Sequence, residues 1–446
     1  MKPTLYVLAI LAIFAMVIRT VPHAEAATPP VRAEHRAYDP SLATQEVSFN
    51  LARVQKDPGG AIGWRQLASA YLVAGREKDS QELAKKAQAA AEQSLTIRSN
   101  RNASAAVILS ESFLEQHRFA DALVACEKSL TIEPENDFAE RTLTDIYFEI
   151  GRYDDARKLI AKHFDWNQDP GGLALVARQF ELTGHPSEAI VSLKKALDLA
   201  ESESDLPATT VSWFHIKTGD LMARNGQLAN AESEYQIGLK QNPGSWKAFA
   251  GMARLKAMQG DQKGVLAFGE KLNAIAPMTD VVGLMEDAAR KLGDTQLANK
   301  YAVQVLAMNQ STIDAGTSVK AEQDQTRTHT HDRMFSMYLA DHGKMLALAQ
   351  HAATHDLANR KDIYAYDTYA WATYCLAKDT TSVAGTTSPD YRLIESNQYI
   401  DKALALGTKD AKVLYHAAMI ELALHHDELG NQHLSASKEI NPYYSR

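Results

Sequence analysis

One pattern recurs along most of this chain and restricts its possible folds more than any other feature. A stretch with apolar residues at three- and four-residue spacing is followed by glycine, a second such stretch, and then a proline after a short polar turn. This spacing is typical of amphipathic helices, and glycine and proline mark where helices end. The chain is therefore predicted to be a series of two-helix units.

The clearest copy is AAVILSESFLEQHRFADALVACEKSLTIEPEN, residues 105–136, and Pro243 and Pro277 are separated by 34 residues. Three sets of residues repeat in phase. The glycines that end first helices are Gly75, Gly151, Gly184, Gly226, Gly260 and Gly293; the small residues of second helices are Ala122, Ala156, Ala189, Ala231 and Ala298; and the unit-ending prolines are Pro134, Pro243, Pro277 and Pro442. No alternation typical of strands competes with this interpretation.

The repeated pattern resembles the tetratricopeptide repeat, whose signature is W-x₂-L-G-x₂-Y…A-x₃-F…P with a period of about 34 residues. The resemblance covers most of residues 44–442. It implies an all-α fold without a sheet, a right-handed α-solenoid of about ten helix–turn–helix units. The stretch 46–60 looks like the second helix of a truncated leading unit that caps the array.

After residue 331 the pattern changes in detail and resembles the carboxyl-terminal part of a group of secreted or periplasmic bacterial tetratricopeptide proteins. That group has no established activity, so the resemblance implies a family but no biochemical function. The matching residues are Asp332–Arg333, Ala340–His342, Asp362–Tyr364, Tyr366–Asp367, Ala370–Ala372, Lys402–Leu404, Leu406–Thr408, Tyr415–Ala417, Met419–Ile420 and Asn441–Pro442. The Ser/Thr-rich stretch 378–392 departs from that group's pattern.

The predicted organisation has five parts. Residues 1–26 form a signal peptide, because one lysine precedes an apolar run from Leu5 to Ile18 and the small residues of AEA end at Ala26. Residues 27–43 form an extended linker, 44–308 a capping helix plus about seven units, 309–331 a polar linker and 332–446 the last units. The apolar run is shorter than the roughly 20 residues of a membrane span. Cleavage after Ala26 into a periplasmic or secreted protein is expected, with an uncleaved amino-terminal anchor as the alternative.

Composition limits the possible partners. The net charge of −8, without a sustained Lys/Arg cluster after the amino terminus, argues against nucleic acid as a partner. After removal of the signal, no segment is apolar enough to span a membrane. Cys126 and Cys375 lie in helical patterns far apart in the sequence, so we expect two buried free thiols and no disulfide.

First helices line the inner surface of such a solenoid, and their polar and aromatic residues are the candidate partner-binding groups. Counting from the helix starts, these candidates are Arg141, Asp145, Arg178, Glu181, Trp213, Asp220, Arg224, Lys247, Arg254 and Trp371, with His416 added from the family resemblance. Trp213 could equally pack between units. For His416 we favour a buried histidine that bonds the preceding unit near Asp367 or Tyr364.

Nine of the 15 histidines lie at or beyond His329, which raises metal or small-ligand binding by the last third as an alternative function. His351 and His355 have helical metal-binding spacing, but Ala352 occupies the position where a zincin has glutamate. In HHDELG, His425 takes the place of a turn glycine. We therefore predict no metal site, with His351 and His355 as the weak candidates, and we expect no cofactor.

No nucleophile motif or phosphate-binding loop is present in the sequence. The chain is therefore predicted to be a scaffold without catalytic residues that binds a protein or peptide partner in its concave groove.

Overall fold

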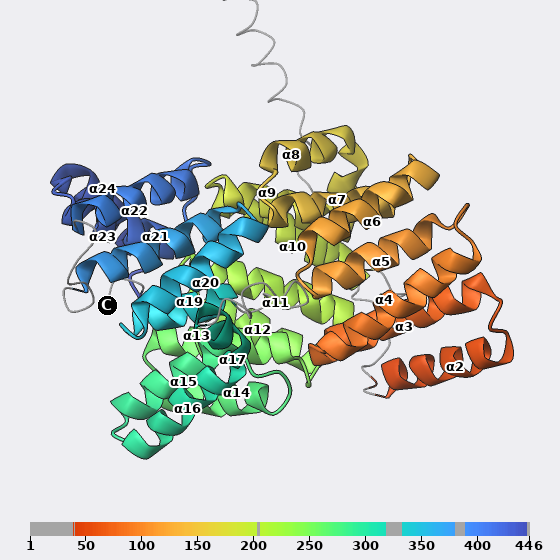
Figure 1. The fold of residues 1–446 in the computed structure, drawn as a ribbon, viewed down its shortest axis with the longest axis horizontal. Helices are drawn as coiled ribbons and strands as arrows, with labels where there is room; N and C mark the ends of the chain where they lie inside the picture. The colour runs from red at the N-terminus through yellow and green to blue at the C-terminus, as the bar shows by residue number, and fades with distance from the viewer. Residues whose placement is uncertain (1–38, 40, 203–205, 318–331, 380–388, 444–446) are drawn as a thin grey trace, which may run out of the picture.

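The computed structural model describes residues 39, 41–202, 206–317, 332–379 and 389–443. These residues form 22 α-helices and one 3₁₀-helix, and the described ranges contain no strand (Figure 1). The all-helical solenoid expected from the sequence is confirmed. Several predictions fall on residues outside the described ranges. These are the signal peptide with its cleavage after Ala26, the two histidines His329 and His331, and residues 380–388 of the Ser/Thr-rich stretch.

A single helix, α2 (Leu42–Lys56), precedes ten hairpins in which consecutive helices pack against each other. The hairpins are α3 (Ala61–Lys78) with α4 (Gln81–Ile97), α5 (Ala103–Glu115) with α6 (Phe119–Ile132), α7 (Asp137–Glu149) with α8 (Tyr153–Lys162), α9 (Pro170–Leu182) with α10 (Pro186–Ser202), α11 (Ala208–Arg224) with α12 (Leu228–Gln241), α13 (Trp246–Gln259) with α14 (Gln262–Asn273), α15 (Thr279–Lys291) with α16 (Thr295–Met308), α19 (Asp332–Asp341) with α20 (Leu346–Asn359), α21 (Ile363–Lys378) with α22 (Pro389–Leu404), and α23 (Ala411–Ala423) with α24 (Asp427–Ile440). The 3₁₀-helix η1 (Phe164–Gln168) lies between α8 and α9, and α17 (Gln310–Thr317) lies between α16 and α19.

The hairpin turns depend on residues with positive φ. Gly151, Gly184, Gly226, Gly260 and Gly293 all adopt this conformation where their first helices end, as the sequence pattern indicates. His117 and His425 adopt it at the corresponding turns of their own hairpins, so the prediction that His425 replaces a turn glycine is confirmed. The prediction for Gly75 is wrong: α3 continues to Lys78, and Asp79 takes the left-handed conformation. The reason is that Arg76, Glu77 and Lys78 are good helix formers, and Ser80 then caps α4.

Small residues allow the two helices of a hairpin to approach closely. The five predicted alanines, which are Ala122, Ala156, Ala189, Ala231 and Ala298, have no exposed surface. A buried serine adds a repeated polar contact: the hydroxyls of Ser129, Ser396 and Ser437 each donate to the backbone carbonyl 26 residues earlier in the chain, at 2.6–3.0 Å. None of the described helices combines the length and apolar composition needed to cross a bilayer.

The stretch expected to be a polar linker, residues 309–331, begins with a helix. In α17, the Thr312 hydroxyl donates to Asp332 Oδ1 at 2.7 Å, and Asn309 Nδ2, just before the helix, donates to Thr279 at 3.0 Å. Helix α17 packs against α20, while α19 packs directly on α15. The change in sequence pattern therefore does not interrupt the array.

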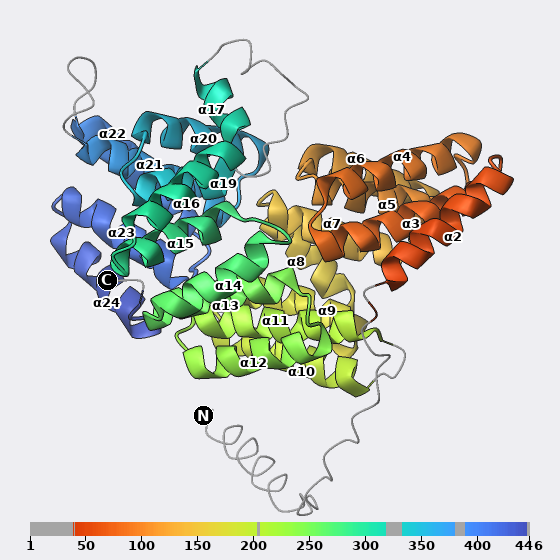
Figure 2. The ribbon, with the colours of Figure 1, turned by 90° about the horizontal axis from the view of Figure 1, so that it is seen from below.

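The array curves until its last units meet its central units. The turns after α20, α22 and α24 lie against the turns after α7, α9 and α11. Figure 2 shows α24, in blue, beside the green helices around α13. The inner surface of the central units is therefore partly enclosed by the carboxyl-terminal units.

Candidate functional site

A cavity of about 470 Å³ lies on the inner surface of the central units. The first helices α7, α9 and α11 supply most of its lining, and one residue comes from the carboxyl-terminal units. The lining residues are Arg141, Asp145, Glu149, Gly171, Ala174, Leu175, Ala177, Arg178, Glu181, Leu182, Leu193, Trp213, Lys217, Leu221, Arg224 and Tyr364. The wall thus combines charged groups with alanine, leucine and tryptophan side chains, a mixture typical of ligand sites.

Six of the eleven candidates named from the sequence line this cavity: Arg141, Asp145, Arg178, Glu181, Trp213 and Arg224. They converge because helices α7, α9 and α11 occupy the same position in successive units. Helical spacing then directs residues three or four positions apart, such as Asp145 and Arg141, to one face. Glu149, Lys217 and Tyr364 also line the cavity, and none of them was among the partner-binding candidates.

Arg178 is the centre of an ion-pair network in the cavity wall. Its guanidinium lies 3.2 Å from Asp145 and 2.6 Å from Glu149, both on the preceding first helix. The second carboxylate oxygen of Glu149 lies 3.0 Å from Arg360, which belongs to the carboxyl-terminal units. Burial alone would raise the pKa of Glu149, but Arg178 and Arg360 outweigh it and lower that pKa to about 2.

The other two arginines of the cavity are also paired with carboxylates. Arg141 contacts Asp137 at 2.6 Å and Asp169 at 2.7 Å, and Arg224 pairs with Glu181. The pairs with Asp169 and Glu181 connect neighbouring units, and all three pairs neutralise charge predicted for the groove. The arginines therefore shape the wall more than they attract a charged partner.

Two polar groups of the lining keep unused bonding capacity. Lys217 is exposed, lies 5.7 Å from the centre of the Trp213 ring, and makes no ion pair within the described residues. The Tyr364 hydroxyl likewise has no hydrogen bond within the described part of the chain. Together with Trp213 they form a wall that offers an aromatic face, a cation and a hydroxyl.

Three further candidates, Asp220, Lys247 and Arg254, do not line the cavity. Asp220 accepts a hydrogen bond from Tyr235 at 2.7 Å, and Arg254 pairs with Asp280 of the next unit at 2.7 Å. The ammonium group of Lys247 lies 5.2 Å from the ring centre of Trp246, and desolvation, aided by the charge of Lys217, lowers its pKa. The bond from Tyr235 holds Asp220 within its own hairpin, whereas the ion pair with Asp280 holds Arg254 against the next unit.

Trp371 and His416 are packing residues of the last units. His416 is 1% exposed; its Nδ1 lies 2.8 Å from Asp367 Oδ1, which is the contact favoured from the sequence. Its ring stacks on Trp371 at 4.1 Å, and the Trp371 indole donates to Asp341 at 2.7 Å. The groove assignment of His416 is therefore wrong, because the side chain is buried between α21 and α23.

The carboxyl-terminal histidines are distributed over separate contacts. The rings of His351 and His355 lie 4.5 Å apart, and His351 Nε2 is buried without a hydrogen-bond partner in the described structure. His433 pairs with Glu421 at 2.8 Å. Among the described residues, the three-ligand groups that could hold a metal do not include any of these histidines.

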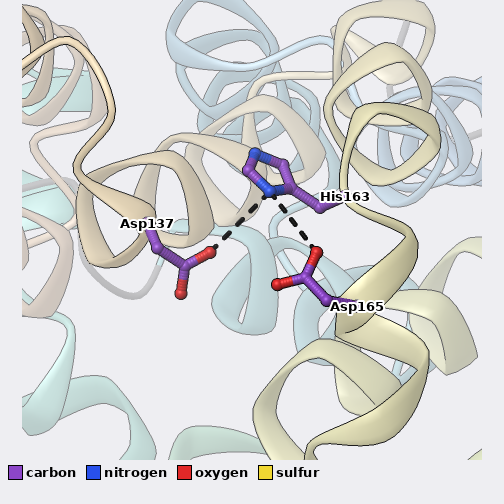
Figure 3. A group of neighbouring side chains, drawn as sticks. All are labelled: Asp137, His163 and Asp165. Carbon is purple, nitrogen blue, oxygen red and sulfur yellow. Dashed lines mark ion pairs between the residues drawn. The ribbon is translucent and has the colours of Figure 1, made fainter.

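The one such group found in the described residues is Asp137, His163 and Asp165, near the start of α7 and η1 (Figure 3). His163 Nδ1 lies 3.9 Å from Asp137 and 3.8 Å from Asp165. Asp137 also accepts hydrogen bonds from Arg141 and from the Trp166 indole at 2.6 Å. The neighbouring guanidinium already supplies the positive charge that a metal would bring, so the group is a local ion-pair cluster.

The two thiols are free, as expected from the sequence. Cys126 is buried, whereas Cys375 is only partly buried, which corrects the expectation of two buried thiols. Burial raises the pKa of each thiol to about 12, so neither is a thiolate nucleophile near neutral pH.

Similarity to known proteins agrees with this geometry over part of the chain. Residues 113–178 match the family described as Tetratricopeptide repeat. The matched stretch begins in α5 and runs through α8 to α9, so it includes the repeats that supply Arg141, Asp145 and Arg178 to the cavity. No curated protein matches the chain.

Three solved structures are weakly similar to this chain. PilW, a type IV pilus biogenesis factor, is 21% identical, with 47% of this chain and 94% of PilW covered and a TM-score of 0.38. The Cut9–Hcn1 hetero-tetramer of the APC/C is 11% identical, with 90% and 92% covered and a TM-score of 0.32. YrrB, described as having an unusual peptide-binding site, is 16% identical, with 52% and 93% covered and a TM-score of 0.22. All three superpose poorly, and the fold of this chain follows from its own repeats.

Proposed function

We propose that this protein is a scaffold without catalytic function that binds an extended segment of a protein or peptide partner in the cavity of repeats α7 to α11. The observation that supports this most directly is the cavity itself, which places Trp213, Lys217 and leucine side chains around about 470 Å³. Repeat solenoids characteristically use this concave surface for proteins and peptides. The free cation of Lys217 suits an acceptor or anionic group on the partner.

The test is partner capture with variants on opposite faces of the same region. The protein is incubated with envelope extract, cross-linked through a photoreactive residue at position 213, and the captured protein is identified by mass spectrometry. Lys217→Glu, which reverses the unpaired cavity charge, is expected to lose the captured species. Lys194→Glu on the outer helix α10 reverses an exposed charge and is the matched control. If both variants capture the same species as the parent protein, the cavity is not its binding site.

We further propose that the mature protein is periplasmic or secreted, on the basis of the apolar run Leu5–Ile18 and the AEA ending at Ala26. The resemblance of residues 332–442 to secreted bacterial repeat proteins supports the same location. Intact-mass measurement of the protein purified from a bacterial envelope fraction is expected to give an amino terminus at Ala27. A mass that retains residues 1–26 would favour the membrane-anchored alternative.

A further inference from the structure

Three consecutive hairpin turns of the central units each meet a turn of the carboxyl-terminal units more than 200 residues later. Gly151 lies against Lys361, Gly184 against Gly407, and Gly226 against Ile440. The order is the same on both sides, so successive units meet successive units. We call this set of six residues the seam.

The seam requires glycine for a reason beyond backbone conformation. A Cβ atom at Gly151 or Gly184 would collide with the backbone carbonyl of Lys361 or Gly407, and one at Gly226 would lie 2.6 Å from the Ile440 carbonyl oxygen. Gly260 and Gly293 occupy the same turn position with a similar positive φ, yet no atom of the described chain lies within 4 Å of a Cβ placed there. Positive φ is thus shared by these five turn glycines, whereas among them only the three of the seam approach another backbone closely.

Polar and apolar contacts around the seam are specific. The Ile363 amide donates to the Tyr153 hydroxyl at 2.8 Å, and the buried Asn441 side chain donates to the Ala223 carbonyl at 3.0 Å. The Ile363 side chain is 1% exposed and packs in one cluster with Phe148 and Leu182 of the central units. A buried side chain and satisfied backbone groups are features of an interface that is closed in the native state.

The seam also positions part of the cavity wall. Tyr364 follows Ile363 directly, and it is the lining residue contributed by the carboxyl-terminal units. Glu149, another lining residue, is held by Arg360 from the opposite side of the same seam. Separation of the two sides would remove both the Tyr364 wall and the partner of Glu149.

We propose that the cavity is a composite site, which exists only while the seam is closed and which the carboxyl-terminal units complete through Tyr364. This inference rests on the proposed function, because it concerns the same cavity. It assigns the last three hairpins the role of positioning a wall of the site.

The experiment compares Gly184→Ala with Gly293→Ala in the full-length protein without any partner. Both variants place a side chain at positive φ, but only Gly184→Ala collides with the opposite backbone. We expect hydrogen exchange at the Ile363 amide to accelerate by about tenfold or more in Gly184→Ala, because overpacking of this kind weakens an interface substantially. The radius of gyration from X-ray scattering and the acrylamide quenching of Trp213 should increase in the same variant.

Gly293→Ala should leave all three quantities at the values of the unmodified protein. Equal exchange, radius and quenching in the two variants would overturn the proposal. Should Gly184→Ala fail to fold, Tyr153→Phe removes only the hydroxyl that accepts from Ile363, and unchanged exchange at that amide would count equally against the seam. Because no partner is used, failure here is distinguishable from failure to find a partner.

Discussion

At the scale of single residues, the distinctive feature of this chain is the pairing of charged side chains between units. Glu149 accepts from Arg178 and Arg360, and Asp362 contacts Arg333 at 2.7 Å. A carboxylate between two guanidinium groups is stabilised in its charged form. Such pairs make the inner surface more specific in shape than in net charge.

Glu149→Gln tests this pairing through its pH dependence. The folded-state pKa of about 2 lies below the ordinary value of 4.5, so the stabilisation by Glu149 is complete above pH 4.5 and is lost as the pH falls toward 2. The variant should unfold more easily at pH 7, by at most about 3 kcal/mol, and the difference from the parent should shrink in acid. Urea unfolding from pH 7 to pH 3 measures this, and Glu127→Gln on the exposed face of α6 should change little. A difference that is constant with pH would contradict the assignment.

His416→Ala tests the buried histidine contact of the last units. The substitution leaves a void beside Trp371 and deprives Asp367, itself 4% exposed, of its partner. The expected loss in unfolding free energy is about 2–4 kcal/mol. His426 is exposed just before α24, and the unfolding free energy of His426→Ala should stay within about 0.5 kcal/mol of the parent value. Equal losses in thermal unfolding of the two variants would show that His416 is not a packing residue.

At the scale of secondary-structure elements, the hairpin turns differ in the residue type that adopts positive φ. Most of the described hairpin turns have glycine at the position of positive φ, whereas Asp79, His117 and His425 have a side chain there. A side chain in the left-handed region is strained relative to glycine. In the turn of the last hairpin, His425 therefore occupies a backbone conformation that favours glycine.

His425→Gly is expected to stabilise the protein by about 1 kcal/mol, because glycine adopts the φ of +61° without this strain. The melting temperature of the full-length protein measures the effect. His426→Gly is the matched control, since His426 has a φ of −85° and gains nothing from glycine. A rise with His426→Gly as large as that with His425→Gly would contradict the explanation.

At the scale of the whole molecule, the seam makes this array different from an open solenoid. In an open solenoid each unit contacts only its neighbours, so distant units unfold independently. Here the hairpins from α7 to α12 also contact those from α19 to α24. The central and carboxyl-terminal units are consequently expected to unfold together.

This cooperativity predicts how denaturation changes when the seam is opened. The parent protein should show one urea transition shared by the central and carboxyl-terminal units. Hydrogen exchange of backbone amides in both parts measures this transition. Gly226→Ala, which places a Cβ 2.6 Å from a carbonyl oxygen, should divide it into two transitions. Gly260→Ala is the control without a steric conflict. Two separate transitions in the parent protein itself would rule out coupling through the seam.

The cavity shows how far helical spacing can predict a site. Spacing alone identified Arg141, Arg178 and Trp213, because residues on one face of successive first helices are brought together by the repeat itself. It did not identify Tyr364. This residue belongs to the carboxyl-terminal units and follows the other lining residues by more than 130 positions in the chain. Helical spacing also could not distinguish Arg254, which pairs with Asp280 outside the cavity, from the arginines that line the cavity.

The sequence by itself determined the helices, most of their turns, the buried alanines and the inward face of the central units. These features depend on contacts between residues close in sequence, where periodicity and turn residues leave a clear signal. Only the tertiary structure decided that the array closes on itself and that Tyr364 joins the cavity. The physical reason is that the seam joins backbone groups of distant turns, and its glycines look the same in sequence as Gly260 and Gly293, where an added Cβ would meet no atom of the described residues within 4 Å.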